Sequence, residues 1–363
     1  MVYADRFGGP GKVPDEDGVK FEQIFFKLPS IFKKRLVGSI LNKFGLTERM
    51  RFSFDSAQIS ESILKLNNKQ PFDIIESPNN GATLCHLLEH FAGNNCCIRI
   101  ATTDKDHSSI NKTPHSTYLR RLFRAEGDSF RKCPNLVTHT NAHRDLICNE
   151  YGVSKDKFTI IPLSVRIPEE SELLRTRRNP RKVVLFVGRF EKRKGIDIML
   201  KIIPRVLSSR DDIEFRLVGP DDTNSHEETF FSRNPKLRDQ VVFLGEKTGE
   251  PLEDEYRNCD VFVAPSRYES FGLIYAEAMS FGRPAIGTNI GGIPEVITHE
   301  QTGLLCESEN IDQFSSAILR LTSNNLLADK MGKEARCRAV KYFDFEKLLE
   351  DTESYYFKHS EAS

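Results

Sequence analysis

The sequence predicts an α/β protein built from two doubly wound domains, each a parallel sheet with helices on both faces. Short apolar runs rich in β-branched residues alternate with segments of helical pattern, which is typical of parallel strands joined by helices. The alternation occurs in two blocks along 363 residues, a length that suits two domains. A charged, proline-containing stretch separates the blocks, and no short repeat of fixed period indicates a solenoid.

The first block is expected to contain four strands, because four short apolar runs are bounded by polar or turn residues. These runs are residues 71–77, 96–103, 135–140 and 158–165. Helical patterns are found at 56–67, 81–92 and 119–130, and from the end of the third strand to Tyr151. Residues 1–20 carry Gly, Pro and charge and are expected to form a loop.

The second block opens with KVVLFVGRF at 182–190, a strongly β-branched run that predicts a strand. Five further strands are expected at 213–219, 241–245, 261–266, 284–288 and 303–307. Helices are expected at 195–208, 253–258 and 272–281, with a short helix after Gly292. Residues 312–358 are almost all helical in pattern.

These elements predict the limits of the domains. We expect a first domain at 1–167, a linker at 168–182, a second domain at 183–335 and a final helix at 336–363. A return of this final helix onto the first domain stays open as an alternative.

The composition argues against several classes of function. Lys+Arg and Asp+Glu both number 52, and nucleic acid is therefore not expected as the main partner, because neutralising phosphates needs a basic surplus. None of the eight cysteines has the spacing of a zinc site, and most lie in apolar runs, as expected of reduced thiols. No apolar run is long enough to cross a bilayer. We therefore expect a cytoplasmic protein without a zinc site and without a cofactor.

Residues 27–51 form a basic amphipathic stretch with seven basic residues and one acid, Glu48. Two readings stay open for it. The stretch either contacts an anionic membrane surface as a peripheral segment, or forms an ordinary amphipathic helix whose apolar side packs on the first sheet.

The first candidate site lies in VGRFEKRKGID, where a predicted strand ends and a helix begins. Ligands of open α/β sheets bind beyond the carboxyl ends of the strands, and Arg189 and Lys194 would both project there. A guanidinium fork and a compact ammonium suit a diphosphate. The alternative is that the charged residues form a solvated turn, since the pattern is not that of a P-loop.

The second candidate site lies in APSRYESFGLIYAEAMSFGRP at 264–284. A strand ends at Val263, and a helix is expected to begin near Gly272, where free backbone N–H groups would form an anion site. Glu269 precedes this point and Glu277 follows it by roughly 8 Å along the helix axis. Carboxylates accept hydrogen bonds from hydroxyl groups, which sugars carry. Alternatively, Glu269 caps the helix and Glu277 is an exposed helical residue.

Together these stretches resemble the retaining glycosyltransferases of family 4 (glycosyl transferases group 1). The resemblance rests on the glutamates Glu269 and Glu277, with seven residues between them, and on the Gly-Arg and Lys-Gly pairs at Gly188–Arg189 and 194–195. It is strong over about 158–322 and weaker over 71–157. It implies a GT-B fold, in which two Rossmann-like doubly wound domains face each other, here with an incomplete N-terminal, acceptor-side domain and a C-terminal donor-binding domain.

The resemblance also implies roles for residues. Arg189 and Lys194 would bind the donor diphosphate and stabilise the leaving group, with Gly188 beside them. Backbone N–H groups of three residues would hold phosphate and sugar: Phe271, Gly272 and Leu273. Glu269 would hold the transferred sugar.

In the nucleotide part of the donor, Glu277 would hold the ribose, and Glu246 and Lys247 lie where the family seats the base. Such enzymes need no metal and retain the anomeric configuration. The resemblance therefore implies a hexosyltransferase that uses a UDP- or GDP-sugar and a hydroxyl acceptor on a glycan, a lipid-linked sugar or a small molecule.

The N-terminal half departs from the family pattern. The family opens with a strand and a Gly-Gly loop, whereas no apolar strand is expected before Gly8 and Gly9. Ala101 or Thr102 falls near a position where the family tends to place a His. An alternative function is therefore a catalytically impaired protein that binds nucleotide sugars. A GT-B epimerase is a third reading, which the glutamate pair disfavours.

A further motif, GTNIGGIPEVI at 287–297, is expected to form a turn into a helix. Two readings stay open for it: a loop near the donor, as in the family, or a turn needed for packing. In the first half, His107, Asp104, Asp106 and Glu126 are weaker candidates for functional residues.

Overall fold

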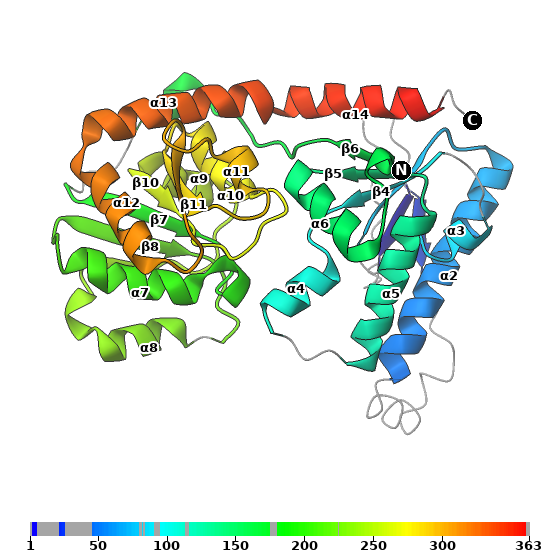
Figure 1. The fold of residues 1–363 in the computed structure, drawn as a ribbon, viewed down its shortest axis with the longest axis horizontal. Helices are drawn as coiled ribbons and strands as arrows, with labels where there is room; N and C mark the ends of the chain where they lie inside the picture. Colours follow the sequence, from blue (N-terminus) through cyan, green and yellow to red (C-terminus); the bar gives the residue numbers. More distant parts are fainter. Residues whose placement is uncertain are drawn as a thin grey trace. The chain divides into compact units, whose positions relative to one another are not determined.

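The computed structural model (Figure 1) divides by its internal contacts into two compact units. The first unit consists of Met1–Val137, Ile147–Thr159 and Tyr355–Ser363, and the second of Thr138–Leu146 and Ile160–Ser354. The structure describes residues 2–5, 22–25, 46–79, 82, 84–90, 95–112, 116–174, 180–223 and 225–360.

The first unit contains a four-stranded sheet whose strand order follows the sequence, β3-β4-β5-β6. Its strands are β3 (Ile75–Pro78), β4 (Cys96–Ile100), β5 (Asn135–Thr138) and β6 (Phe158–Ile160), and β3 pairs with β4 in parallel. The helices of this part of the chain are α2 (Leu46–Lys69), α3 (Leu87–His90), α4 (Asp104–Ile110), α5 (Thr117–Lys132) and α6 (Asn141–Tyr151). Two strands pair in parallel apart from this sheet, β1 (Val2–Asp5) and β2 (Glu22–Phe25).

The second unit contains a six-stranded sheet in the order β12-β11-β10-β7-β8-β9, and its neighbouring strands pair in parallel. The strands are β7 (Lys182–Val187), β8 (Ile213–Val218), β9 (Val241–Phe243), β10 (Val261–Val263), β11 (Ala285–Thr288) and β12 (Gly303–Cys306). The chain first builds the sheet from β7 to β9 and then returns to place β10 on the other side of β7. Strand order therefore reverses between β7 and β10, which is the point where open α/β sheets bind ligands.

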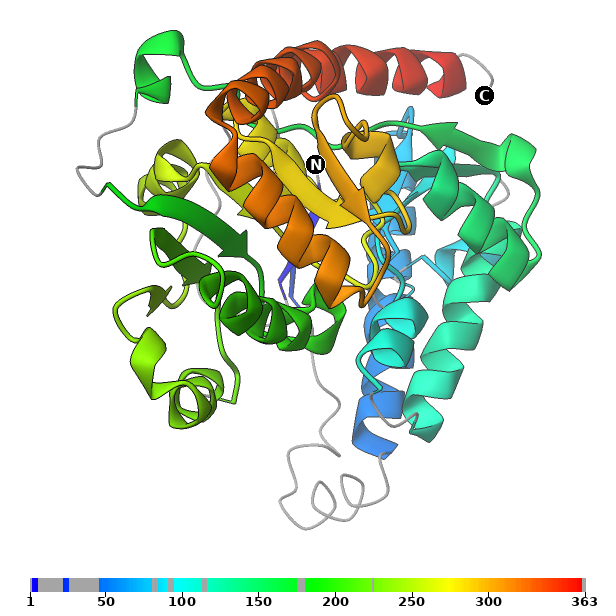
Figure 2. The same ribbon diagram turned by 60° about the vertical axis from the view of Figure 1, so that its left-hand side comes forward.

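Helices cover both faces of this second sheet, as the views in Figures 1 and 2 show. Helix α7 (Ile196–Leu207) packs against α12 (Ile311–Ser323) on one face, and α10 (Leu273–Ser280) packs against α13 (Asn325–Tyr342) on the other. The remaining helices are α8 (His226–Arg233), α9 (Glu250–Asn258), α11 (Ile293–Val296) and α14 (Phe345–Ser360). Because both faces are covered, the central strands are buried apolar runs, β7 from Val183 onward and β10 throughout, whereas β8 carries Glu214 and Arg216 at half-buried positions.

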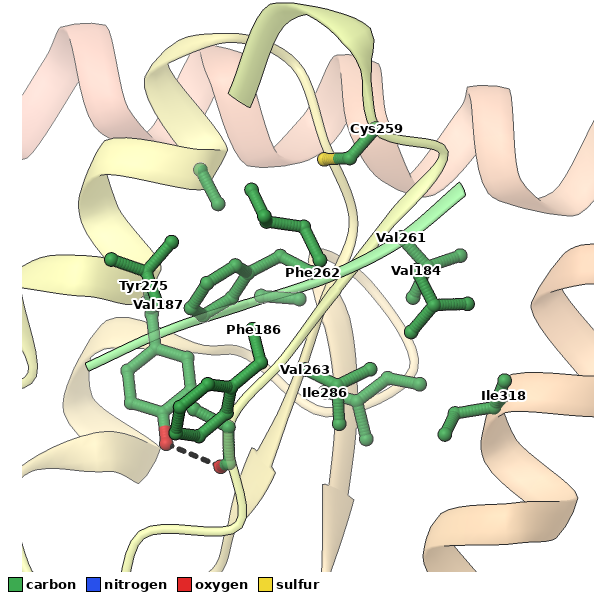
Figure 3. Close-up of a cluster of buried hydrophobic side chains, with 14 of the residues drawn as sticks. Val184, Phe186, Val187, Cys259, Val261, Phe262, Val263, Tyr275, Ile286 and Ile318 are labelled. Atoms are coloured by element: carbon green, nitrogen blue, oxygen red, sulfur yellow. Dashed lines mark hydrogen bonds between the residues drawn. The ribbon is translucent and has the colours of Figure 1, made fainter. Parts of the chain in front are cut away.

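The core of the second unit is centred on β7 and β10 (Figure 3). Val184, Phe186 and Phe262 are completely buried there. Tyr275 on α10 is buried with them, and its hydroxyl donates a hydrogen bond to the carbonyl of Ala264 at 2.7 Å. A rigid core thus lies directly beneath the loops that leave β7 and β10.

The predicted α/β class with parallel sheets is confirmed, whereas several elements differ in detail. Residues 104–110, for which no helix was expected, form α4, because the Thr103 hydroxyl accepts a hydrogen bond from the N–H of Asp106 and caps the helix. The crossover between β8 and β9 contains α8, which was not expected. The segment 312–358 forms three helices, and β1 lies within the stretch 1–20 expected to be a loop.

Contrary to expectation, a strand does precede Gly8 and Gly9, because β1 pairs in parallel with β2. Gly8 and Gly9 themselves lie outside the described residues, as does most of the basic stretch 27–51, of which only the residues from Leu46 belong to a described helix. No helix in the described ranges combines the length and the apolar character that a bilayer crossing requires.

Candidate functional site

The loop after β7 carries the first predicted residues. Gly188 follows the strand, and Lys194 ends a short 3-10 turn that stops at Gly195, whose φ is 75°. A Cβ atom on Gly195 would stand 2.0 Å from the carbonyl oxygen of Pro265, so glycine allows the β7 and β10 loops to touch. This close approach brings Lys194 to the loop that follows β10.

The loop after β10 presents Glu269 to two cations. Lys194 Nζ lies 2.6 Å from Glu269 Oε1, and Arg193 Nη1 lies 3.1 Å from Glu269 Oε2. The Ser266 hydroxyl donates a third hydrogen bond, to Oε1 at 3.0 Å. Arg193 also pairs with Glu191 at 2.9 Å. Glu269 is 6% exposed, so this is a buried ion cluster at the point where strand order reverses.

The electrostatic surroundings keep Glu269 charged. Burial raises the pKa of this carboxyl, but the charges of Lys194 and Arg193 and the hydrogen bonds from Lys194 and Ser266 outweigh burial, so its pKa lies below the usual value. The site therefore offers a carboxylate in a fixed orientation.

Free backbone donors follow at the start of α10. Gly272 adopts a left-handed φ of 100° and begins the helix. Among the hydrogen bonds of the described ranges, none uses the N–H groups of Phe271, Gly272 or Leu273. Three unused donors at a helix N-terminus form a site for an anionic group.

Glu277 lies one turn into α10 and is half-buried. The hydroxyl of Tyr256 on α9 donates a hydrogen bond to Glu277 Oε2 at 2.6 Å. Burial raises the pKa of Glu277, while the Tyr256 hydrogen bond and the charge of Lys194 oppose this rise. Lys194 therefore acts electrostatically on both glutamates, which the structure brings to one site.

The Gly291–Gly292 turn packs against the backbone of the loop that carries Glu269. The N–H of Gly292 donates to the carbonyl of Glu269 at 2.8 Å. Cβ atoms on Gly291 and Gly292 would stand 2.5 Å from the Glu269 oxygen and 2.4 Å from the Ser270 oxygen. The turn is thus packed on the backbone that leads to the free N–H groups, and only glycine fits there.

The Thr138–Leu146 stretch of the second unit holds the same region. Thr140 Oγ1 donates to the carbonyl of Ser270 at 2.7 Å. Glu295 on α11 accepts from the N–H groups of Asn141 at 3.0 Å and Ala142 at 2.8 Å, where a carboxylate is favoured by the start of α6. These contacts restrict the movement of the loop.

Three of the predicted site residues do not belong to the ion cluster around Glu269. Arg189 follows Gly188 on the β7 loop and its side chain is exposed. Glu246, after the edge strand β9, is exposed too. Lys247 lies beside it and pairs with Glu255 on α9 at 2.5 Å.

Sequence reasoning missed Arg193, Ser266 and Tyr256. Arg193 looked like part of a charged turn, and the only signal was its place next to Lys194. Ser266 lies three residues before Glu269, a spacing that favours a local hydrogen bond. Tyr256 gave no signal, because its contact with Glu277 joins two different helices and depends on the tertiary fold.

The first unit contains a buried carboxyl, Glu126, which was a weak candidate. It is fully buried on α5, and Asn79 Nδ2 and the Tyr151 hydroxyl donate to it at 2.8 and 3.3 Å. Burial raises its pKa to about 7, with the charge of Asp104 adding to the effect. Asn79 in turn accepts from the N–H of Ala101 at 2.9 Å, so this network fixes the end of β4.

Glu126 predicts a pH-dependent stability. The pKa of Glu126 is higher in the folded than in the unfolded state, so the protonated carboxyl stabilises the fold. This contribution to the free energy of unfolding is fully present below about pH 4.5 and is lost as the pH rises towards 7. A rise from 4.5 to about 7 corresponds to about 3 kcal/mol. We expect Glu126→Gln to raise the melting temperature at pH 8 more than at pH 5, as thermal unfolding at both values would measure. An equal shift at both values would contradict a raised pKa.

Chemically, the site combines Lys194 and three backbone donors for an anionic group with two carboxylates that can accept hydrogen bonds from hydroxyls. These are the groups that a diphosphate with polyhydroxylated substituents requires.

Comparisons with known proteins match part of the chain to a family of glycosyltransferases. Residues 173–338 match the family model described as glycosyl transferases group 1. An uncharacterised glycosyltransferase of Methanocaldococcus jannaschii is 25% identical over 63% of this chain and 60% of its own length. The N-acetyl-alpha-D-glucosaminyl L-malate synthase of Bacillus anthracis is 31% identical over 48% of this chain and 45% of its own length. The chain thus spans about half of the length of the curated relatives that it matches.

Solved structures share the fold at low sequence identity. Sucrose-phosphate synthase of Thermosynechococcus elongatus has a TM-score of 0.73 and 22% identity, covering 86% of this chain and 79% of its own. HepE of Anabaena, solved in complex with UDP and glucose, has a TM-score of 0.69 and 16% identity, covering 93% and 86%. The fold is of the GT-B class, and residues 173–338 match the glycosyl transferases group 1 family.

Proposed function

We propose that the chain is a retaining, metal-independent hexosyltransferase that takes a hexose from a UDP- or GDP-sugar and passes it to a hydroxyl acceptor. The observation that carries the proposal is the buried cluster of Lys194 and Glu269 beside the free N–H groups of residues 271–273. The family of residues 173–338 and the complex of HepE with UDP and glucose support a nucleotide-sugar donor. The eight free thiols support a cytoplasmic location.

The proposed roles follow from the charges. Transfer breaks the bond between the anomeric carbon and the diphosphate oxygen and forms a new bond to the acceptor oxygen, while the proton of the acceptor hydroxyl passes to the departing diphosphate. Negative charge then develops on the departing diphosphate, where Lys194 and the exposed Arg189 would stabilise it. Glu269 would accept hydrogen bonds from the sugar, and Glu277 from the ribose.

Gly188 and the N–H groups of Phe271, Gly272 and Leu273 would line the diphosphate part of the site. Glu246 and Lys247 would lie near the base. The acceptor hydroxyl belongs to a glycan, a lipid-linked sugar or a small molecule in this proposal.

A thermal-shift screen of the full chain with UDP-, GDP- and ADP-sugars tests donor binding, because a ligand of the folded state raises its melting temperature. Release of the nucleoside diphosphate from the stabilising sugar then tests transfer. Stabilisation without release in the presence of glycan, lipid-linked and small hydroxyl acceptors would instead support a catalytically impaired nucleotide-sugar binder. No stabilisation by any donor would contradict both.

A further inference from the structure

We propose that Tyr256 is a positioning residue for the donor nucleotide, because it holds Glu277 in the conformation that accepts hydrogen bonds from the ribose hydroxyls. The inference rests on the proposed function of the site. It adds a residue that sets the preference of the site for ribose without touching the donor.

The contact between the two side chains is short and enclosed. The Tyr256 hydroxyl donates to Glu277 Oε2 at 2.6 Å, and Tyr256 is 1% exposed. Among the hydrogen bonds of the described ranges, none uses Oε1 of Glu277. One oxygen of the carboxylate is therefore held by the protein, and the other stays available to a ligand.

The tyrosine itself is held firmly. Its ring is stacked on Phe281 at a centroid distance of 6.1 Å and an interplanar angle of 16°. It also packs against Phe262 at 5.8 Å. Its carbonyl accepts from Arg283 Nε at 3.2 Å. A hydroxyl on a ring fixed in this way has one position, so it selects one orientation of the carboxylate.

Selection of one orientation matters for binding. A glutamate side chain has several rotamers, and ordering one such side chain on binding weakens affinity by a factor of about 2 to 10. Tyr256 orders Glu277 before the nucleotide arrives. Its hydrogen bond also favours the charged carboxylate against burial, which keeps the free oxygen an acceptor for hydroxyl groups.

If the Tyr256 hydroxyl only stabilised the fold, its loss would not affect nucleotide binding selectively. The chain offers a matched control for this alternative. Tyr275 is equally buried, and its hydroxyl donates to a backbone carbonyl, Ala264 O, at 2.7 Å. Tyr256→Phe and Tyr275→Phe each remove one buried hydroxyl from the same core. Only the first change removes a contact with Glu277.

The test compares nucleotides with and without ribose hydroxyls. Calorimetric titration gives the affinities of the full-length wild type and both variants for UDP, GDP or ADP, whichever binds, and for the matching 2′,3′-dideoxynucleoside diphosphate. We expect the preference for the ribonucleotide to fall about 2- to 10-fold in Tyr256→Phe and to stay unchanged in Tyr275→Phe. We also expect Glu277→Ala to abolish the preference, so that adding Tyr256→Phe to it has no further effect.

Several outcomes would overturn the inference. A wild-type preference in Tyr256→Phe removes the positioning role, as does an equal fall in Tyr275→Phe or a further fall in the Glu277→Ala background. Thermal unfolding confirms that each variant is folded before titration. A wild type that binds none of the three nucleotides would instead contradict the proposed function of the whole site, which is a distinguishable failure.

Discussion

Glu269→Gln is expected to reduce transfer by at least about 100-fold, because loss of one fixed contact to the reacting sugar misplaces it. The glutamine side chain has the same shape, so packing is kept. The change nevertheless leaves Arg193 and Lys194, only 12% and 16% exposed, without the carboxylate they pair with. Breaking a buried ion pair on one side costs about 3 kcal/mol of unfolding free energy or more. Initial rates of nucleoside diphosphate release and denaturant unfolding would measure the two effects.

A second ion pair of the chain provides the control. Lys65 Nζ and Glu61 Oε1 are also 2.6 Å apart, but these side chains are 70% and 65% exposed. Exposed pairs contribute little, so Glu61→Gln should change neither transfer nor stability measurably. Wild-type transfer in Glu269→Gln would remove Glu269 from the catalytic site, whatever its effect on stability.

The pH dependence of stability separates the charge of Glu269 from its shape. Its folded pKa lies below the ordinary value, so its stabilising contribution is present above about pH 4.5 and is lost as the pH falls through the folded pKa. Glu269→Gln should therefore lose part of the acid sensitivity of the wild type. Denaturant unfolding at pH 3.5 to 6 would show a smaller slope in the variant.

The strands of the second unit could be predicted because buried strands appear in the sequence as continuous apolar runs. Residues of β7 such as Val184 and Phe186 lie between two layers of helices, and such strands become continuous apolar runs. Glycine and charge then mark where each run ends. The candidate residues Lys194 and Glu269 could be named for the same reason, since each follows such a strand.

The meeting of those residues could not be predicted from local pattern alone. Strand order places β7 next to β10, although 73 residues separate Val187 from Val261, and that order is a property of the whole sheet. The Arg193 and Tyr256 contacts depend on it in the same way. Helix α4 was missed for a local reason. Its residues are mostly charged or polar and show no apolar periodicity, and the cap at Thr103 depends on the backbone turn.

Gly292→Ala is expected to weaken donor binding by at least about 10-fold. Gly292 has an ordinary φ of −77°, so alanine costs nothing in backbone conformation. Its Cβ, however, would stand 2.4 Å from the Ser270 oxygen and 2.9 Å from the Phe271 Cα, so that backbone has to move. Overpacking of this kind costs about 1–3 kcal/mol of unfolding free energy. The backbone N–H groups of residues 271–273 must lie within about 0.2 Å of the ideal hydrogen-bond distance, so a shift of this backbone would break their hydrogen bonds to the bound ligand.

Gly152→Ala distinguishes a moved loop from a merely less stable protein. Gly152 has a φ of 65° and nothing within 4 Å of an added Cβ, so alanine there pays only for the left-handed conformation, about 1–2 kcal/mol. Both variants are therefore expected to melt earlier by a similar amount. Only Gly292→Ala should lose affinity in a calorimetric titration with the nucleotide that the wild type binds. Equal affinities in the two variants would mean that the Gly291–Gly292 turn serves packing and does not position the N–H groups of residues 271–273.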